Sequence, residues 1–104
     1  MIQIADARRL PLADEVVGLT VTSPPYNLGR EYADTDDSIA YSEYLGFTRD
    51  WLAECYRVTA DNGRLCLNLP IDNNKNGHRS TYIDVVSIAK KAGWNYKSTI
   101  CWDK

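Results

Sequence analysis

The segment that most constrains this chain is an apolar, β-branched run that leads almost directly into two prolines. Residues Val16–Thr22 read VVGLTVT, a composition typical of a buried parallel strand. Pro24 and Pro25 follow, and because proline fixes φ and lacks a backbone N–H, a strand has to end there. We therefore expect a strand of a parallel sheet whose carboxyl end carries residues 23–27.

Strands and helices alternate along the rest of the chain. Further short strands are predicted at Ile2–Ala5, Arg64–Leu69 and Tyr96–Trp102, and residues 28–37 are expected to form an irregular loop. One helix is expected to follow a Ser38 cap and to stop at Asp61-Asn62-Gly63, and a second is expected to run from Thr81 to Gly93. This order predicts βαβ units, and therefore an α/β fold of mostly parallel strands with flanking helices.

Each predicted helix carries apolar residues three and four positions apart, which indicates one buried face. In the first helix these are Tyr41, Tyr44, Leu45, Thr48, Trp51, Leu52, Cys55 and Tyr56. In the second they are Tyr82, Val85, Val86, Ala89 and Ala92, with Thr81 and Asp84 as a candidate capping box. Trp51 is accordingly interpreted as a core residue.

Composition limits the class of protein. The 104 residues suffice for a single small domain, 1–104, and three widely spaced cysteines form neither a disulfide framework nor a metal site. No apolar run is long enough to cross a membrane and no secretory signal is evident, so a cytoplasmic protein is expected. The net charge of −2 counts against a nucleic-acid-binding module working alone, because phosphate contacts need basic side chains.

Residues 23–27 are the candidate functional site. The carbonyls of Pro24 and Pro25 remain free to accept hydrogen bonds, Ser23 adds a hydroxyl, and Tyr26 adds a flat aromatic face. A rigid set of acceptors beside a stacking ring suits a flat substrate that bears an amino group. An ordinary exit from a strand into a loop explains the same residues.

The segment resembles the catalytic motif of DNA amino-methyltransferases, Asp/Asn/Ser-Pro-Pro-Tyr/Phe, at Ser23-Pro24-Pro25-Tyr26. Further landmarks resemble the β-type permuted members of that family over nearly the whole chain. They are Asp6-Ala7-Arg8, Leu10-Pro11-Leu12, Asp14 and Val17 before the motif, and Glu54–Val58, Gly63-Arg64-Leu65, Gly93-Trp94 and Trp102-Asp103-Lys104 after it.

The resemblance implies a partial Rossmann-like methyltransferase sheet, S-adenosylmethionine as the cofactor and double-stranded DNA as the partner. It implies that Ser23, Pro24, Pro25 and Tyr26 are catalytic: Tyr26 stacks on a flipped base, while Ser23 and the Pro24 carbonyl accept hydrogen bonds from its amino group. A serine at position 23 is associated in this family more with N4 of cytosine than with N6 of adenine.

Three further positions take roles by resemblance. Asp6 resembles the acidic residue that contacts the cofactor adenine, although a turn aspartate explains it equally well. Asn27 and Arg30 open a loop that would close over the base, or that is merely solvated. His78 is the single histidine and has no partner at metal-ligand spacing, so no metal site is expected.

Two parts of the family pattern are missing from this chain. It has no glycine-rich cofactor motif of the Phe-x-Gly-x-Gly kind. Two strands of the complete sheet also have no counterpart: the cofactor-motif strand that neighbours the catalytic strand, and the antiparallel strand that lies beside Arg64–Leu69. Because unpaired strand edges are costly and promote association, we expect self-association, partial disorder or a complementing methyltransferase segment. The alternatives are a methyltransferase that acts on RNA or on protein glutamine, and a non-catalytic fragment or interaction domain.

Overall fold

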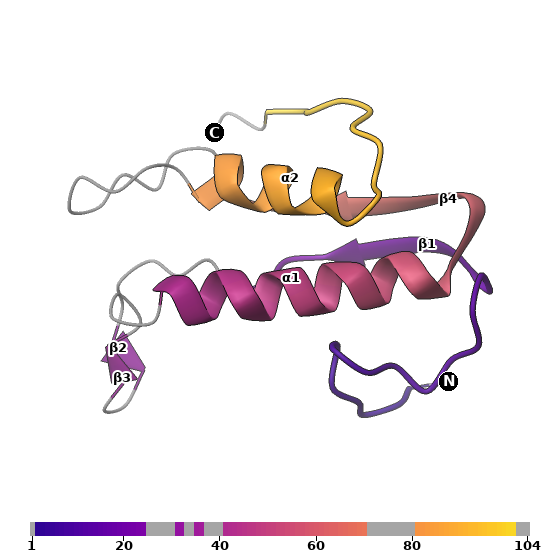
Figure 1. Ribbon diagram of the computed structural model, residues 1–104, viewed down its shortest axis with the longest axis horizontal. Helices are drawn as coiled ribbons and strands as arrows, with labels where there is room; N and C mark the ends of the chain where they lie inside the picture. Colours follow the sequence, from indigo (N-terminus) through magenta and orange to yellow (C-terminus); the bar gives the residue numbers. More distant parts are fainter. Residues whose placement is uncertain (1, 25–30, 33–34, 37–40, 71–80, 102–104) are drawn as a thin grey trace.

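The structure, a computed structural model, describes residues 2–24, 31–32, 35–36, 41–70 and 81–101. Within these ranges its elements are β1 (Val17–Thr22), β2 (Glu31–Tyr32), β3 (Thr35–Asp36), α1 (Tyr41–Val58), β4 (Thr59–Leu67) and α2 (Thr81–Lys91). Figure 1 shows α1 and α2 running side by side along the length of the β1–β4 sheet.

The sheet of β1 and β4 is parallel, and α1 is part of the connection that joins the two strands. Neighbouring parallel strands need such a crossover, so the βαβ unit expected from the sequence is confirmed. The chain is therefore a small α/β protein in its described part. β2 and β3 form a separate antiparallel ladder, which corrects the expectation of a wholly irregular loop at residues 28–37.

The first helix ends earlier than the sequence predicts. It ends at Val58, three residues before the stop signal at residues 61–63. The reason is a distant cap: the backbone N–H groups of Glu15 and Val16 donate to the carbonyls of Arg57 and Val58, at 3.0 and 2.8 Å. These bonds satisfy helix carbonyls that would otherwise lack partners.

The predicted stop signal is used inside β4 instead. Val17 pairs with Thr59 but Leu19 pairs with Arg64, so the residues between the two pairs form a bulge in β4. Asn62 adopts a left-handed φ of 68° there, a conformation that asparagine tolerates better than most residues. The strand predicted at Arg64–Leu69 is thus present, with bounds Thr59–Leu67.

The core lies between the two helices and one face of the sheet. Its buried residues are Trp51, Leu52, Cys55, Val85 and Ile88, and Leu65, Leu67, Leu69 and Trp94 pack against them. The apolar face predicted for the first helix is confirmed at its centre, and Trp51 is only 4% exposed. Tyr56 departs from that prediction because it is 48% exposed. Its ring packs edge-on against that of Trp94, with 5.5 Å between the ring centres.

The second helix buries a face rotated slightly from the predicted one. Its buried residues are Thr81, Asp84, Val85 and Ile88, whereas Tyr82 and Val86 are half-buried. The helix ends as predicted at a glycine: Gly93 has a φ of 115°. Its N–H bonds the Lys90 carbonyl at 3.2 Å, and the next N–H bonds the Ala89 carbonyl at 3.1 Å, which is a Schellman motif.

Two predicted strands are wrong. Residues 2–5 form no strand, and Ile2 and Ile4 are 98% and 99% exposed. Residues 96–101 likewise form no strand, and Ile100 is 92% exposed, while Trp102 lies outside the described residues. Both segments have strand-like composition, but a strand needs a neighbour to pair with, and the described part of the chain pairs neither of them.

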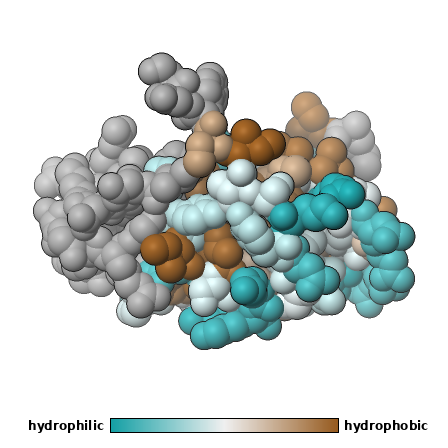
Figure 2. Space-filling model, turned by 90° about the horizontal axis from the view of Figure 1, so that it is seen from above, coloured by the Kyte–Doolittle hydropathy of each residue, from teal (hydrophilic) through white to brown (hydrophobic). Residues whose placement is uncertain are grey.

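One face of the β1–β4 sheet carries exposed apolar side chains. Leu19 and Val21 are 59% and 71% exposed, whereas Thr20 and Thr22, on the opposite face, are half-buried beside Leu65 and Leu67. We call Leu19, Val21 and their neighbour Cys66 the open face. Apolar side chains also reach the surface among hydrophilic ones in the view of Figure 2.

Candidate active site at the carboxyl ends of β1 and β4

The predicted motif begins where two parallel strands end side by side. Ser23 follows the last residue of β1, and Asn68 follows the last residue of β4. The backbone N–H of Asn68 donates to the Thr22 carbonyl at 2.9 Å, so the ladder extends one step past β4. In addition, the Asn68 side-chain Nδ2 donates to Ser23 Oγ at 3.2 Å. The site therefore holds a pair of polar side chains at the edge where ligands of parallel sheets bind.

Strand register decides which way these side chains point. Leu19 and Val21 alternate with the threonines of β1, and Ser23 continues the same alternation onto the open face. Asn68 does so on the neighbouring strand, and both residues are exposed. Pro24 is buried, so the residue that follows Ser23 is anchored while the hydroxyl faces outward.

The sequence predicts Ser23 and Pro24 as site residues, and their roles stay predictions; it does not single out Asn68, which the structure places beside Ser23. Asn68 lies inside an alternating RLCLNL run, where a polar residue is ordinary for a half-buried strand. The signal that finds it is topological: the carboxyl ends of neighbouring parallel strands meet at one edge of the sheet. Pro25, Tyr26, Asn27 and Arg30 lie outside the described residues, so their roles stay predictions.

Asp6 lies in an exposed turn of the N-terminal segment, near α1. Its Oδ1 accepts hydrogen bonds from Arg8 N and Nε at 2.9 and 3.0 Å, and its Oδ2 accepts one from Nη2 at 2.7 Å. These bonds with Arg8 lower the pKa of the Asp6 carboxyl to about 2. The Arg8 guanidinium also stacks over the Phe47 ring of α1, 5.4 Å from its centre. The geometry is that of an Asx-type turn, and the cofactor role of Asp6 stays a prediction.

The described residues do not by themselves fit S-adenosylmethionine. Both oxygens of the Asp6 carboxylate are already bonded to Arg8, and the turn around them is exposed. A shallow groove of about 450 Å³ lies elsewhere, along α2 beside Tyr82, Val86 and Lys90. Among the described residues, no cluster of three metal-ligating side chains occurs, and no helix is long and apolar enough to cross a bilayer.

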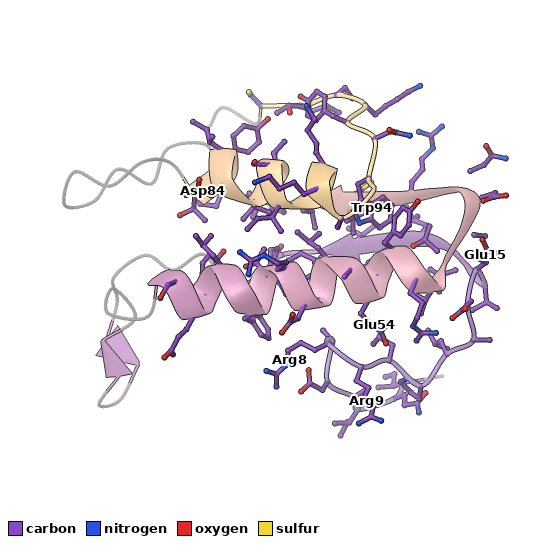
Figure 3. All side chains as sticks on the ribbon, viewed as in Figure 1. Arg8, Arg9, Glu15, Glu54, Asp84 and Trp94 are labelled. Carbon is purple, nitrogen blue, oxygen red and sulfur yellow. The ribbon has the colours of Figure 1, made fainter. Side chains whose placement is uncertain are left out.

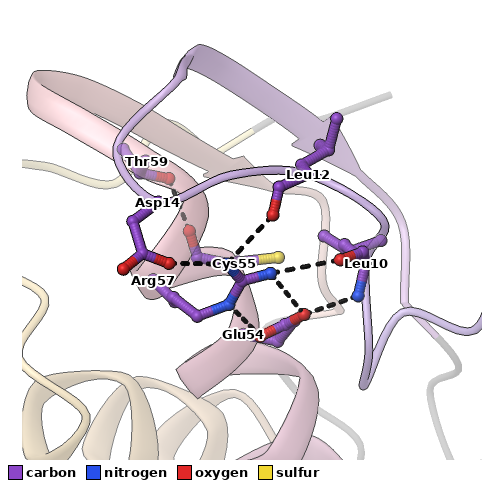
Figure 4. A network of polar contacts seen from close by, with 7 residues as sticks. All are labelled: Leu10, Leu12, Asp14, Glu54, Cys55, Arg57 and Thr59. Atoms are coloured by element: carbon purple, nitrogen blue, oxygen red, sulfur yellow. Dashed lines mark hydrogen bonds and ion pairs between the residues drawn. The ribbon is translucent and has the colours of Figure 1, made fainter.

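A second polar network fixes the approach to β1 (Figure 4). The Arg57 guanidinium donates to both oxygens of Glu54 at 2.7 and 2.9 Å and to Asp14 Oδ1 at 2.6 Å. It also donates to the carbonyls of Leu10 and Leu12, at 3.1 and 3.0 Å. Through these bonds, Arg57 holds residues 10–14 against the end of α1, immediately before β1 begins.

Glu54 is the acidic centre of this network. It points from α1 toward the N-terminal segment (Figure 3), and it accepts the Leu10 N–H as well as the Arg57 guanidinium. The hydrogen bonds from Arg57, and then the one from Leu10, lower the pKa of the Glu54 carboxyl to about 2. Glu54 and in turn Asp14 raise the pKa of Arg57 above its ordinary value. Glu54 and Arg57 are three positions apart on α1, but their contacts with Leu10, Leu12 and Asp14 join residues more than 40 positions apart. The sequence alone therefore does not predict the network.

Taken together, the described residues define a βαβ unit of an α/β protein with a polar site at the carboxyl edge of its sheet. Residues 17–104 match the family model described as DNA methylase, which covers most of the chain. The chain therefore belongs to the DNA methylase family.

Similar proteins are type II methyltransferases. M.MjaVI of Methanocaldococcus jannaschii is 44% identical over 99 residues, which make up 95% of this chain and 51% of that protein. M.HpaI of Haemophilus parainfluenzae is 44% identical over 54 residues, 52% of this chain and 17% of that protein. M.ScaI of Streptomyces caespitosus is 28% identical over 92 residues, 82% of this chain and 29% of that protein. The chain thus spans about half the length of M.MjaVI, and no solved structure matches it.

Proposed function

We propose that this protein methylates an exocyclic amino group of a base in double-stranded DNA, N4 of cytosine or N6 of adenine, with S-adenosylmethionine as the methyl donor. The observation that carries the proposal is the outward-facing Ser23 hydroxyl, followed by the anchored Pro24, at the carboxyl end of a parallel strand in a DNA methylase. The similar proteins are all type II methyltransferases, which supports a role in restriction and modification.

In this proposal the acceptors at the strand end orient the amino group. Ser23 Oγ and the Pro24 carbonyl accept its two N–H groups, which turns the nitrogen lone pair toward the methyl donor. The donor, when bound, would supply the methyl group: its sulfur–carbon bond would break as the nitrogen–carbon bond forms, and the methylated nitrogen would release a proton to solvent. Fixed acceptors favour this step because they need no rearrangement as positive charge develops on the nitrogen.

The remaining motif residues act on the rest of the base. Tyr26 stacks on the base once it has left the duplex, and Pro25 keeps the backbone between the acceptors and the ring rigid. Asn27 and Arg30 line the base, and Asp6 would contact the cofactor adenine only as part of a site that the described residues do not complete. A serine at position 23 favours cytosine over adenine as the target.

We further propose that a complementing methyltransferase segment, or a second copy of the chain, completes the sheet. Parallel sheets are covered on both faces, yet Leu19 and Val21 on the open face are more than half exposed. The outer edge of β1 also has no partner strand among the described residues. A wider Rossmann-like sheet would bury both features and supply the cofactor site.

The test is methyl transfer by the complete protein. Tritiated S-adenosylmethionine and whole-genome-amplified DNA, which carries no methylated bases, would be incubated with the protein, and the nucleosides analysed by mass spectrometry. We expect N4-methylcytosine or N6-methyladenine, a loss of most of the product with Ser23→Ala, and no loss with Ser98→Ala, an exposed serine in the C-terminal segment.

The alternatives give different products in the same experiment. If the label appears in RNA or on a glutamine side chain and none appears in DNA, the methyl acceptor is RNA or protein instead of DNA. A folded protein that binds neither the donor nor DNA would favour a non-catalytic interaction domain.

A further inference from the structure

A side chain from the neighbouring strand holds the hydroxyl at the head of the motif. Asn68 Nδ2 donates to Ser23 Oγ at 3.2 Å, and the Asn68 backbone N–H donates to Thr22 at 2.9 Å. The backbone bond continues the pairing of Thr22 with Leu67, so the position of the Asn68 side chain is set by strand register. Both side chains are exposed on the open face.

The direction of this hydrogen bond has a chemical consequence. A serine hydroxyl has one hydrogen to donate and two lone pairs with which to accept. The Asn68 amide occupies one lone pair, so the hydroxyl no longer rotates freely, and the second lone pair is left to accept an N–H from a substrate. The amide is neutral, so it orients the oxygen without adding a charge that would attract a cation to the site.

We infer that Asn68 is a positioning residue: its side chain holds Ser23 Oγ in the orientation in which that oxygen accepts the amino group of the methyl acceptor. The inference rests on the proposed function, because it assigns a role to Asn68 in the same reaction. It adds β4 to the active site, which the motif alone confines to the end of β1.

Local geometry argues against a purely structural role for this side chain. The backbone bond to Thr22 already ties the end of β4 to β1, so the side-chain bond is not needed to join the strands. A hydrogen bond between two exposed side chains competes with water and adds little to stability.

The experiment compares Asn68→Ala and Asn68→Asp in the complete protein, each also combined with Ser23→Ala. Aspartate keeps the size of asparagine but, when ionised, has no hydrogen to donate. Asn95→Asp, at an exposed position in the C-terminal segment, is the matched control for the added charge. Methyl transfer from tritiated S-adenosylmethionine to whole-genome-amplified DNA gives kcat and KM for both substrates, and thermal unfolding reports stability.

The expected result is a fall in kcat of about three- to tenfold for both Asn68 variants, the size of one lost neutral hydrogen bond. KM for both substrates, and the unfolding temperature relative to Asn95→Asp, should stay unchanged. In the Ser23→Ala background the Asn68 substitutions should have no further effect on kcat, since the hydroxyl they act through is gone.

Three outcomes overturn the inference. An unchanged kcat would show that Ser23 needs no partner, and a fall that persists in the Ser23→Ala background would show that Asn68 acts on something else. A fall that comes with weaker binding of both substrates and a lower unfolding temperature would mark a structural residue. If the unsubstituted protein transfers no methyl group to DNA, the proposed function itself fails. That result is distinct from the three outcomes above, which concern Asn68 alone.

Discussion

Truncating a leucine in the core and a leucine on the open face should have very different effects on the free energy of unfolding. Leu52 lies on α1 in the core and is fully buried, whereas Leu19 lies on the open face of β1 and is 59% exposed. We expect Leu52→Ala to lower the free energy of unfolding by about 2–5 kcal/mol, because it removes buried methyl groups and leaves a cavity.

The matched change at Leu19 should cost far less in the same chain. About two fifths of its surface is buried, so the transfer free energy at stake is about 1 kcal/mol. A chain of this size has a stability near the low end of about 5–15 kcal/mol, so Leu52→Ala should remove a large part of it.

Urea unfolding followed by tryptophan fluorescence measures both effects, because Trp51 lies in the core beside Leu52. We expect a large fall in the urea midpoint for Leu52→Ala and a small one for Leu19→Ala. Equal falls would refute the reasoning, since they would mean that the open face is already buried in solution. In that case the sheet pairs with something at the concentration used, and light scattering on the same samples would reveal it.

Two further predictions concern the polar network and the end of α2. The bonds with Arg57 and a backbone N–H lower the pKa of Glu54 to about 2, so its ionised form adds stability that is complete above about pH 4.5 and is lost as the pH falls toward 2. In Glu54→Gln the free energy of unfolding should therefore fall less steeply with pH over that range than in the unsubstituted chain. An identical pH dependence would contradict the network. Gly93→Ala should cost about 2 kcal/mol in urea unfolding, because φ is 115° there and a Cβ would lie 2.8 Å from Tyr56 Cζ. Gly46→Ala is the control: its Cβ would meet nothing within 4 Å, so this helix substitution should be neutral or stabilising, and similar losses at both glycines would argue against the strained φ.

The parts of the fold that could be predicted from the sequence are those fixed by local signals. The β-branched run of β1 is ended by prolines whose backbone cannot continue a strand, and α2 ends at a glycine that adopts a positive φ. The spacing of Trp51 and Leu52 from Cys55, four and three positions, likewise indicates the buried side of α1 directly. These features depend on residues that are near neighbours in the chain.

The errors arise where distant residues decide. Asn62 and Gly63 look like a helix stop, but the end of α1 is set by Glu15 and Val16, whose N–H groups reach its last carbonyls from more than 40 positions away. The runs at residues 2–5 and 96–101 have strand composition and no partner in the described chain. Composition measures a tendency to form a strand, whereas pairing depends on which neighbour the chain supplies.

The candidate site divides in the same way. Ser23 and Pro24 could be predicted as candidates because they are consecutive residues of one motif, and the structure brings them to the carboxyl edge of the sheet. Asn68 could not be singled out from its own surroundings in the sequence. Its contact with Ser23 exists because Thr22 pairs with Leu67, and a shift of one residue in this register would turn the amide to the opposite face.

The alternation in β1 links the site to the open face. Its threonines, Thr20 and Thr22, lie toward the core, and its larger apolar residues, Leu19 and Val21, lie away from it. A sheet with one face in water would have the reverse arrangement, whereas a parallel sheet covered on both sides needs no polar face at all. Since Ser23 continues the outward alternation, the proposed methyl acceptor would bind at the rim of whatever covers Leu19 and Val21. A complementing segment on this face would therefore stabilise the sheet and enclose the proposed amino-binding acceptors at the same time. This would account for one strand carrying both exposed apolar residues and the candidate motif.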